Sequence, residues 1–488
     1  MDGVFQRGNK IQLDNVIVQN HKLELKGPNY VVRCYVSLEN TGDSYNVKPL
    51  ADNLDLASGG SNTAWAAKYK AALVSKINDG VDLATATKYA RQIADAGRVE
   101  PGTPAFESLK NTIIKINNWD IKSSSIPDAP ETGGAALVQK SRLYHAEAQW
   151  DLSERVKLFD LLIGGDARIY EIIPDGNNFV DFTRSIADRN TPLKDESFGK
   201  NVYYKKFGGF SQITKAFFDE KLKLFGSVRY DYNPEFDPKL TPRLAAVYTF
   251  KKNHNFRFTF QQGYRFPALF EALSYVNNGR VKRVGSLSYI NQGLGYLENS
   301  YTQTSVIDFN DAVSAAGNTD QAALANRAKL QVANLPKARP ERINSFEVGY
   351  KSVLFNNKLV LDIDAYSNQY DGFLGQVQVF VPKGETVGSD AAVLAMIDRN
   401  RDATTATSTT AAGKGQDRYR VYTNATNTYH NYGSALGLTY NFYKKYTISG
   451  NVNYNKIKSN EVNDIFVTGF NIPGLQIYRL VIARELKI

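Results

Sequence analysis

A two-residue alternation of apolar and polar side chains dominates the chain between positions 210 and 264. In the segment 255–261, Phe256, Phe258 and Phe260 alternate with asparagine, arginine, threonine and glutamine. Because successive side chains of a strand point to opposite faces, each such segment has one apolar face and one wet face. The polar positions include charged residues. This pattern is typical of a strand whose apolar band faces lipid and whose other face lines a water-filled lumen.

The spacing of the turns favours the same architecture. The predicted strand that ends at 218 returns through Asp219-Glu220, and the one that ends at 250 returns through residues 251–254. A longer connection, rich in Asn, Pro and Asp, is predicted between them at 231–242. Short turns that alternate with long connections indicate a membrane-spanning antiparallel barrel. A soluble sandwich also has alternating strands, so the repetition of the pattern carries this prediction.

Hydropathy and charge exclude other classes of protein. The 488 residues are 42% hydrophobic with a mean hydropathy of −0.38. No apolar run approaches the roughly 18 residues that a membrane-crossing helix needs, whereas a barrel needs only alternate residues to be apolar. The net charge of +10 is spread over turns and polar strand faces, among 49 acidic residues. We therefore expect no nucleic-acid partner.

The rest of the chain completes an all-β plan of about a dozen strands. Outside the central stretch, strands are predicted at 21–25, 30–38, 141–152, 155–165, 169–173, 178–182, 202–218, 345–354, 359–366, 432–442 and 446–455. The prediction is a transmembrane antiparallel β-barrel, incomplete, with long and partly helical extracellular loops.

Three regions interrupt the strands and are predicted as extracellular loops at 42–140, 264–342 and 371–427. The first contains three alanine-rich segments with helical spacing, at 65–77, 83–96 and 104–116. The second contains a short alanine-rich stretch at 320–333 that is predicted to be helical, and the third a Thr/Ala-rich run at 403–415.

Two aspartates support a hydrated lumen. Asp362 and Asp364 alternate with Leu361 and Ile363 in a predicted strand. In the interior of a soluble sandwich, each unpaired carboxylate would cost several kcal/mol. Facing water-filled space, the two carboxylates cost little, which favours the barrel.

Residue patterns for catalysis or metal binding are weak. The four histidines stand far apart, and lone Cys34 has no disulfide or zinc partner spacing. Asp398, Asn400 and Asp402 resemble the start of a calcium loop, but the expected Gly and closing Glu are missing. We predict neither an enzyme nor a cofactor nor a metal site.

Four stretches resemble the barrel of TonB-dependent outer-membrane receptors. They are LENTGDSYNV (38–47), ARQIADAGRVEPGTPAF (90–106), LTPRLAAVYTFKKNHNFRFTFQQGYRFPALFE (240–271) and RPERINSFEVGYKSVLFNNKLVLDIDAYSNQYDGFL (339–374). Family members also have an N-terminal plug domain, a TonB box and a closing aromatic strand, none of which is visible here. The resemblance therefore implies a barrel truncated at both ends, with the plug and the export signal upstream.

The resemblance implies a receptor in the outer membrane of a Gram-negative bacterium. Such a receptor imports a scarce large solute, such as an iron chelate, cobalamin, an oligosaccharide or a peptide, with energy from the TonB complex. It implies outer-membrane lipid and the TonB complex as partners, with a surface lipoprotein as a further candidate. A passive porin and a soluble, secreted β-rich glycan-binding protein remain the alternatives.

Solute contacts are expected from the long loops. Tyr264, Arg265, Phe266 and Tyr275 are the candidate substrate-binding residues. Aromatic faces stack on sugars or planar chelates, and arginine pairs with carboxylates. Packing at strand ends and in an aromatic belt is the structural alternative for each of them.

Overall fold

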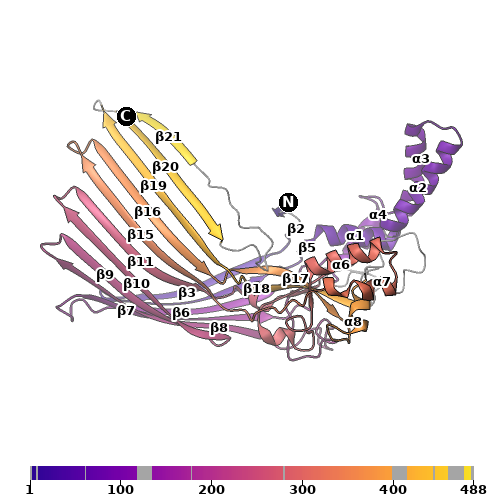
Figure 1. The fold of residues 1–488 in the computed structure, drawn as a ribbon, viewed down its shortest axis with the longest axis horizontal. Helices are drawn as coiled ribbons and strands as arrows, with labels where there is room; N and C mark the ends of the chain where they lie inside the picture. Colours follow the sequence, from indigo (N-terminus) through magenta and orange to yellow (C-terminus); the bar gives the residue numbers. More distant parts are fainter. Residues whose placement is uncertain are drawn as a thin grey trace.

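The largest element of the fold is a 13-stranded antiparallel sheet, which the computed structural model shows as a broad curved wall (Figure 1). The structure describes residues 3–6, 9–60, 62–117, 134–176, 178–277, 281–397, 415–442, 446–459 and 477–484. Neighbouring strands follow the order β21-β20-β19-β16-β15-β11-β10-β9-β8-β7-β6-β4-β3. Antiparallel neighbours in chain order confirm the predicted barrel-type meander. In the described residues, β3 and β21 are the two edges of the sheet.

Most strands of this sheet are longer than the predicted ones. Their bounds are β3 Ile17–Lys26, β4 Tyr30–Asn40, β6 Lys140–Asp151, β7 Asp160–Ile173, β8 Val202–Phe217, β9 Leu222–Asn233, β10 Phe236–Phe250, β11 His254–Arg265, β15 Glu341–Leu354, β16 Leu359–Asp371, β19 Thr428–Phe442, β20 Tyr446–Ser459 and β21 Ile477–Arg484. A strand of 12–16 residues exceeds the roughly 9–11 residues that cross a bilayer, so each such strand also projects beyond the membrane.

The register places the predicted alternation on two distinct faces. Phe256 and Phe258 lie opposite Tyr350 and Val348 on β15. They are 48% and 45% exposed, so these rings are not pooled in a dry core. Arg257 points to the other face, where it meets Asp362. One face is therefore a broad apolar surface, as expected for contact with hydrocarbon, and a packed soluble sandwich would have covered it.

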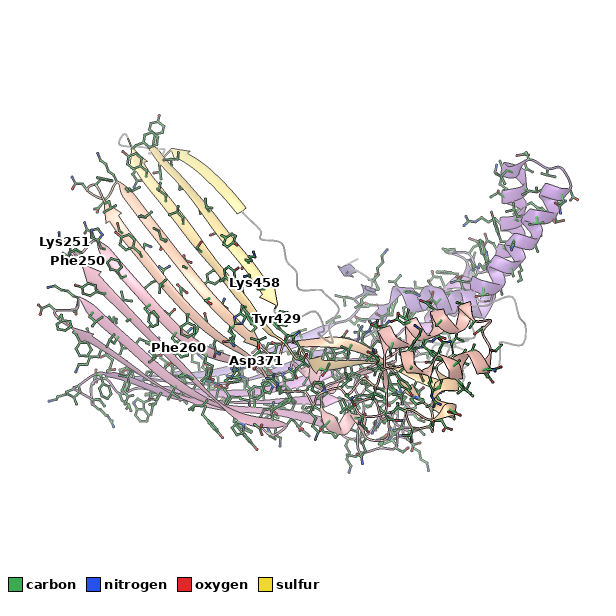
Figure 2. The ribbon with its side chains drawn as sticks, in the orientation of Figure 1. Phe250, Lys251, Phe260, Asp371, Tyr429 and Lys458 are labelled. Carbon is green, nitrogen blue, oxygen red and sulfur yellow. The ribbon has the colours of Figure 1, made fainter. Side chains whose placement is uncertain are left out.

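Most connections alternate between short and long, but β8, β9, β10 and β11 follow one another through short links only. The strands β8 and β9, β10 and β11, and β15 and β16 are joined by tight turns whose non-glycine residues adopt positive φ: Phe218, Asp219, Glu220, Lys251, Lys252, Phe355, Asn356 and Asn357. All these turns lie at one end of the sheet. The long connections lie at the other end, where Asp371 and Tyr429 mark the start of the loop region (Figure 2).

Two predicted breaks in the strands are wrong. The longer connection at 231–242 is absent, because β9 and β10 are separated only by Pro234-Glu235 and the flanking residues pair across the hairpin. The predicted strands 155–165 and 169–173 are one strand, β7, which pairs continuously with β8 across the glycine pair at 164–165. The predicted strand 178–182 is turn and irregular structure.

The first long connection contains four helices rather than three. They are α1 Val47–Ser58, α2 Asn62–Asn78, α3 Leu83–Asp95 and α4 Pro104–Ile113. The Asp82 carboxylate accepts from the amides of residues 84 and 85, and Thr103 caps α4 with a proline at its first turn. Figure 1 shows α2 and α3 as a hairpin that projects from the loop region. No helix in the described ranges is long and apolar enough to cross a membrane.

The second and third long connections form a second, five-stranded sheet, where only loops and a short helix were predicted. Its order is β12-β13-β18-β17-β14, with β12 Tyr275–Asn277, β13 Lys282–Val284, β14 Tyr301–Thr302, β17 Leu374–Pro382 and β18 Gln416–Asn424. Helices α5 Leu269–Leu273, α6 Gln303–Ala315, α7 Asp320–Ala325 and α8 Asp390–Ala395 accompany it. The Thr/Ala-rich run and the calcium-like motif fall almost wholly in 398–414, outside the described residues.

The tightest apolar packing of the molecule lies in this loop region. One cluster unites Tyr275, Val284, Val379 and Val421 with Tyr204 of β8, all at most 1% exposed. Tyr204 pairs with Tyr170, two residues after Arg168, and so lies on the face of the large sheet that carries charges. The core of the loop region is therefore built onto the charged side of the sheet, over its end.

The two faces of β11 offer a direct test. Phe258→Arg places a charge on the apolar face, whereas Thr259→Arg places one on the polar face opposite Glu347. We expect Phe258→Arg to lower the free energy of unfolding in lipid vesicles by about 2–4 kcal/mol, because an arginine at mid-bilayer carries roughly that cost. Urea titration followed by the gel-mobility shift of folded barrel measures this. Equal losses in the two variants would contradict the assignment of the faces.

Candidate functional site

The face of the large sheet opposite the apolar one carries a charged surface, here called the charged face. It comprises Lys22, Glu24, Arg33, Glu147, Asp166, Arg168, Arg229, Asp231, Arg257, Glu347, Lys351, Asp362 and Asp364. Ion pairs join most of these residues across neighbouring strands. Such a surface cannot face hydrocarbon, and it is the part of the sheet that a polar solute or a polar domain could contact.

Arg33 forms the first network. Its guanidinium lies 2.7 Å from a Glu24 oxygen on β3 and 2.7 Å from a Glu147 oxygen on β6. Three strands are thereby joined by one side chain. All three side chains are a third or more exposed, so water screens the pairs and their contribution to stability is small.

Arg229 repeats this arrangement on β9. It lies 2.6 Å from Asp166 on β7 and 2.8 Å from Asp231 on its own strand. Between β7 and β9 runs β8, and the guanidinium crosses it at Gly208. A Cβ atom at that position would lie 2.1 Å from an Arg229 nitrogen. The glycine is thus required for the arginine to lie flat against the wall.

Arg257 forms the largest network, with three carboxylates. Its nitrogens lie 3.4 Å from Glu347, 3.2 Å from Asp362 and 3.5 Å from Asp364. Here too the arginine crosses a glycine, since a Cβ at Gly349 would lie 2.2 Å from its Nε. The two aspartates predicted to face water are partly exposed and paired, which agrees with a hydrated lumen.

Arg265, one of the four candidate solute-binding residues, is held at the rim where β11 ends. It lies 2.6 Å from Glu341 on β15 and 2.8 Å from Glu271 on α5. Each carboxylate also accepts a hydrogen bond from a backbone amide. Glu341 accepts from the amide of Leu374 at the start of β17, and Glu271 accepts from the amide of Ala268. Arg265 therefore fastens the loop region to the sheet.

Tyr264 and Phe266 flank Arg265 and are partly exposed. The Tyr264 hydroxyl donates to Gln262 over 3.4 Å, and Phe266 packs against Phe236 with 5.8 Å between the ring centroids. Three of the four candidates thus lie at one point of the rim, but the Tyr264 and Arg265 side chains, as neighbours in β11, point to opposite faces of the sheet. Contact of these three residues with a solute remains a prediction.

Tyr275 lies elsewhere, inside the core of the loop region. It is 0% exposed, with Phe182 against its ring at 6.0 Å and the Lys282 ammonium 4.5 Å from its centroid. A solute could touch this ring only if the core opened. Packing is the role that the present geometry supports for it.

Sequence reasoning missed the partners of Arg265. Glu271 stands three residues after Ala268, at the third position of α5, where a carboxylate reaches back to the helix start. That spacing could have identified Glu271 from the sequence. No sequence pattern could have identified Glu341, because its role depends on the register between β11 and β15.

The glycines under the arginines generate a matched pair of substitutions. At Gly349 a methyl group would collide with Arg257, whereas at Gly437 on β19 the nearest atom would be 3.8 Å away. We expect Gly349→Ala to lower the free energy of unfolding by about 1–3 kcal/mol, because Arg257 must leave its carboxylates. Gly437→Ala should change it by less than about 0.5 kcal/mol. Urea titration in vesicles measures both values, and the prediction fails if Gly349→Ala is as mild as Gly437→Ala.

Removal of the rim contact should loosen the loop region. In Arg265→Ala, Glu271 and Glu341 lose their shared cation and repel one another. We expect trypsin to cut the 266–340 connection several-fold faster, a rise that reflects easier local opening. Arg243→Ala is the control, since Arg243 bonds only to Gln261 on the neighbouring strand among the contacts described. Equal cleavage rates in the two variants would exclude the fastening role.

Comparisons with known proteins identify the family of the chain. The family model described as "TonB dependent receptor-like, beta-barrel" matches residues 25–483. No curated protein matches the chain.

Solved structures are similar at low identity. The FrpB iron transporter from Neisseria meningitidis is 13% identical with a TM-score of 0.40, over 90% of this chain and 43% of that one. The siderophore receptor PirA from Pseudomonas aeruginosa gives 8% and 0.43, over 92% and 49%. A mutant of the ferric enterobactin receptor PfeA from the same organism gives 10% and 0.40, over 97% and 61%. The chain spans about half the length of these proteins.

The match of the family model over nearly all of the sequence, on a sheet with one apolar and one charged face, shows that this chain belongs to the TonB-dependent receptor β-barrel family.

Proposed function

We propose that this chain is the barrel of an outer-membrane receptor that imports a scarce large solute with energy from the TonB complex. The solute classes considered are an iron chelate, cobalamin, an oligosaccharide and a peptide. The observation that carries the proposal is the loop region with its own packed core, fastened at the rim on the charged side of the sheet.

A folded loop region suits capture of a dilute solute. Buried residues such as Tyr204, Leu273 and Val379 hold its sheet in place before any solute arrives. A binding surface that is ordered in advance loses less entropy when it binds, which favours high affinity. An open pore without such a region would pass small solutes but would not concentrate a rare one.

High affinity in turn creates a need for energy. A solute bound with a dissociation constant of about 1 nM is held by about 12 kcal/mol, and it leaves slowly. Transport at a useful rate therefore requires work to release it inward. In this proposal the TonB complex supplies that work through a plug domain that contacts the charged face.

The partners follow from the surfaces. Outer-membrane lipid covers the apolar face, where Phe256, Phe258 and Val348 are about half exposed. The TonB complex acts from the periplasmic side, where the short turns lie. A surface lipoprotein that covers the loop region is a further candidate partner. Tyr264, Arg265 and Phe266 are proposed to contact the solute at the rim, and Tyr275 to support them from the core.

Uptake measurements test the proposal. Cells that carry the complete gene product should accumulate one of the four solute classes, labelled and supplied at nanomolar concentration. Loss of TonB should reduce this uptake at least tenfold while binding to the cell surface persists. A passive porin would show uptake that does not depend on TonB and that rises linearly with solute concentration, and this result would overturn the proposal.

A further inference from the structure

The five-stranded sheet of the loop region has one face that the packed core does not use. Its core face carries Val284, Val379 and Val421, at most 1% exposed. The opposite face carries Arg283 on β13, Arg420 on β18 and Gln378 on β17, which are register partners in one row across three strands. In the next row, Tyr422 lies opposite Gln376.

Only part of this second face is covered. Phe380 and Tyr301 lie on it at the far end and are buried by the cluster that α6, α7 and α8 form. Arg418 is also placed there, with its guanidinium 5.1 Å from the Phe380 ring centroid. The remaining strip, which consists of Arg283, Arg420, Gln376, Gln378 and Tyr422, is partly exposed throughout. It is here called the arginine strip.

Among the described residues, the two arginines of the strip lack the carboxylate partners that Arg229, Arg257 and Arg265 have. Arg229, Arg257 and Arg265 each bind at least two carboxylates. Within the described ranges, neither Arg283 nor Arg420 has a carboxylate oxygen within 4 Å. Like charges at directly paired positions of a sheet destabilise it, so this pair is costly unless an anion lies between or above it.

The atoms around the arginines suit an oxyanion. The Arg283 Nε is buried and has no acceptor among the described residues. Burial raises the pKa of the Tyr422 hydroxyl, whereas the nearby Arg283 charge and a hydrogen bond from Gln376 oppose that rise. Two guanidinium forks, two amides and a phenol on one surface offer many hydrogen-bond donors.

The strip is connected directly to the rim. β17 begins three residues after Asp371, the last residue of β16, and β18 ends shortly before Tyr429 of β19 (Figure 2). Glu271, which pairs with Arg265, also influences Tyr422. A solute on the strip would therefore lie beside the rim contact that fastens the loop region.

From this juxtaposition we infer that the arginine strip binds a carboxylate group of the solute, so that the imported solute is anionic. Arg283 and Arg420 hold the carboxylate by paired N–H···O bonds, and Gln376, Gln378 and Tyr422 donate to its remaining lone pairs. The inference rests on the proposed function, which leaves the charge of the solute open. It selects carboxylate-bearing chelates and peptides over neutral oligosaccharides.

Binding of a simple polycarboxylate tests the strip. The complete receptor, purified from outer membranes in detergent, is titrated with citrate and with the neutral trisaccharide maltotriose at low salt. We expect citrate to bind and maltotriose not to bind. Arg283→Gln and Arg420→Gln should each weaken citrate binding roughly tenfold, and the double variant roughly a hundredfold, because each removes a bidentate charge-assisted contact.

Arg327→Gln is the matched control. Arg327 also lies in the loop region and is exposed, but it pairs with Asp390 at 2.8 Å and is not on the strip. This variant has the same change in net charge and should bind citrate as the wild type does. An equal loss in the control, or citrate binding no tighter than maltotriose binding, would overturn the inference. Arg420→Lys keeps the charge without the fork and should show an intermediate loss even if the glutamine variants fold poorly.

The binding experiment and the uptake experiment can fail independently of each other. TonB-dependent uptake of a neutral solute, with no citrate binding, would leave the proposed function standing and refute the strip. Citrate binding that depends on Arg283 and Arg420, without TonB-dependent uptake of any of the solutes, would refute the proposed function alone.

Discussion

The need to satisfy backbone hydrogen bonds in hydrocarbon underlies the whole architecture. An N–H or C=O group left unpaired in lipid costs several kcal/mol, so a chain that crosses with strands must pair each strand on both sides. The long registers meet this need for the eleven strands between the edges β3 and β21, and β15 alone pairs 12 residues with β11 and 13 with β16. Once the strands are fixed in this way, alternation leaves no freedom: every second side chain faces lipid, and the others face water.

Arginine side chains have different roles in the charged face and in the loop region. In the wall, Arg229 and Arg257 are held flat by carboxylates on neighbouring strands, over glycines that leave room for them. At the rim, Arg265 joins two carboxylates that belong to separate segments of the loop region. Arginine suits both tasks because its planar fork binds two partners at once. On the arginine strip, by contrast, neither arginine has a carboxylate partner among the described residues.

Sequence reasoning found the hairpins whose strands alternate and whose turns are marked. β15 and β16 are such a case, with an Asn-Asn turn between clear periodic runs, and the fold class followed from repetition of that signal. It divided β7 into two strands, although pairing with β8 runs unbroken through Gly164 and Gly165, whose strand propensity is poor. The same reasoning predicted a loop at 231–242, because Asn, Pro and Asp favour turns. The structure has Pro242 inside β10, although proline is usually confined to strand ends, edges and bulges.

The loop region was the least predictable part. β17 and β18 pair over nine residues, yet one face of β18 carries two arginines, and its partner strand β13 is distant in the sequence. Part of the candidate site could be predicted from the sequence, because Arg265 stands at the end of a predicted strand and therefore at the rim. The burial of Tyr275 could not be predicted, because it depends on packing between three separate connections. Long-range packing of this kind has no local signature.

The two-residue link between β9 and β10 has a consequence for how this receptor can vary. Asn233 before the link is 0% exposed, and Phe236 after it packs against the core of the loop region. At Pro234-Glu235, added residues would wedge the core away from the wall, so an insertion at this point of the rim would loosen the loop region even though it touches no strand of the sheet.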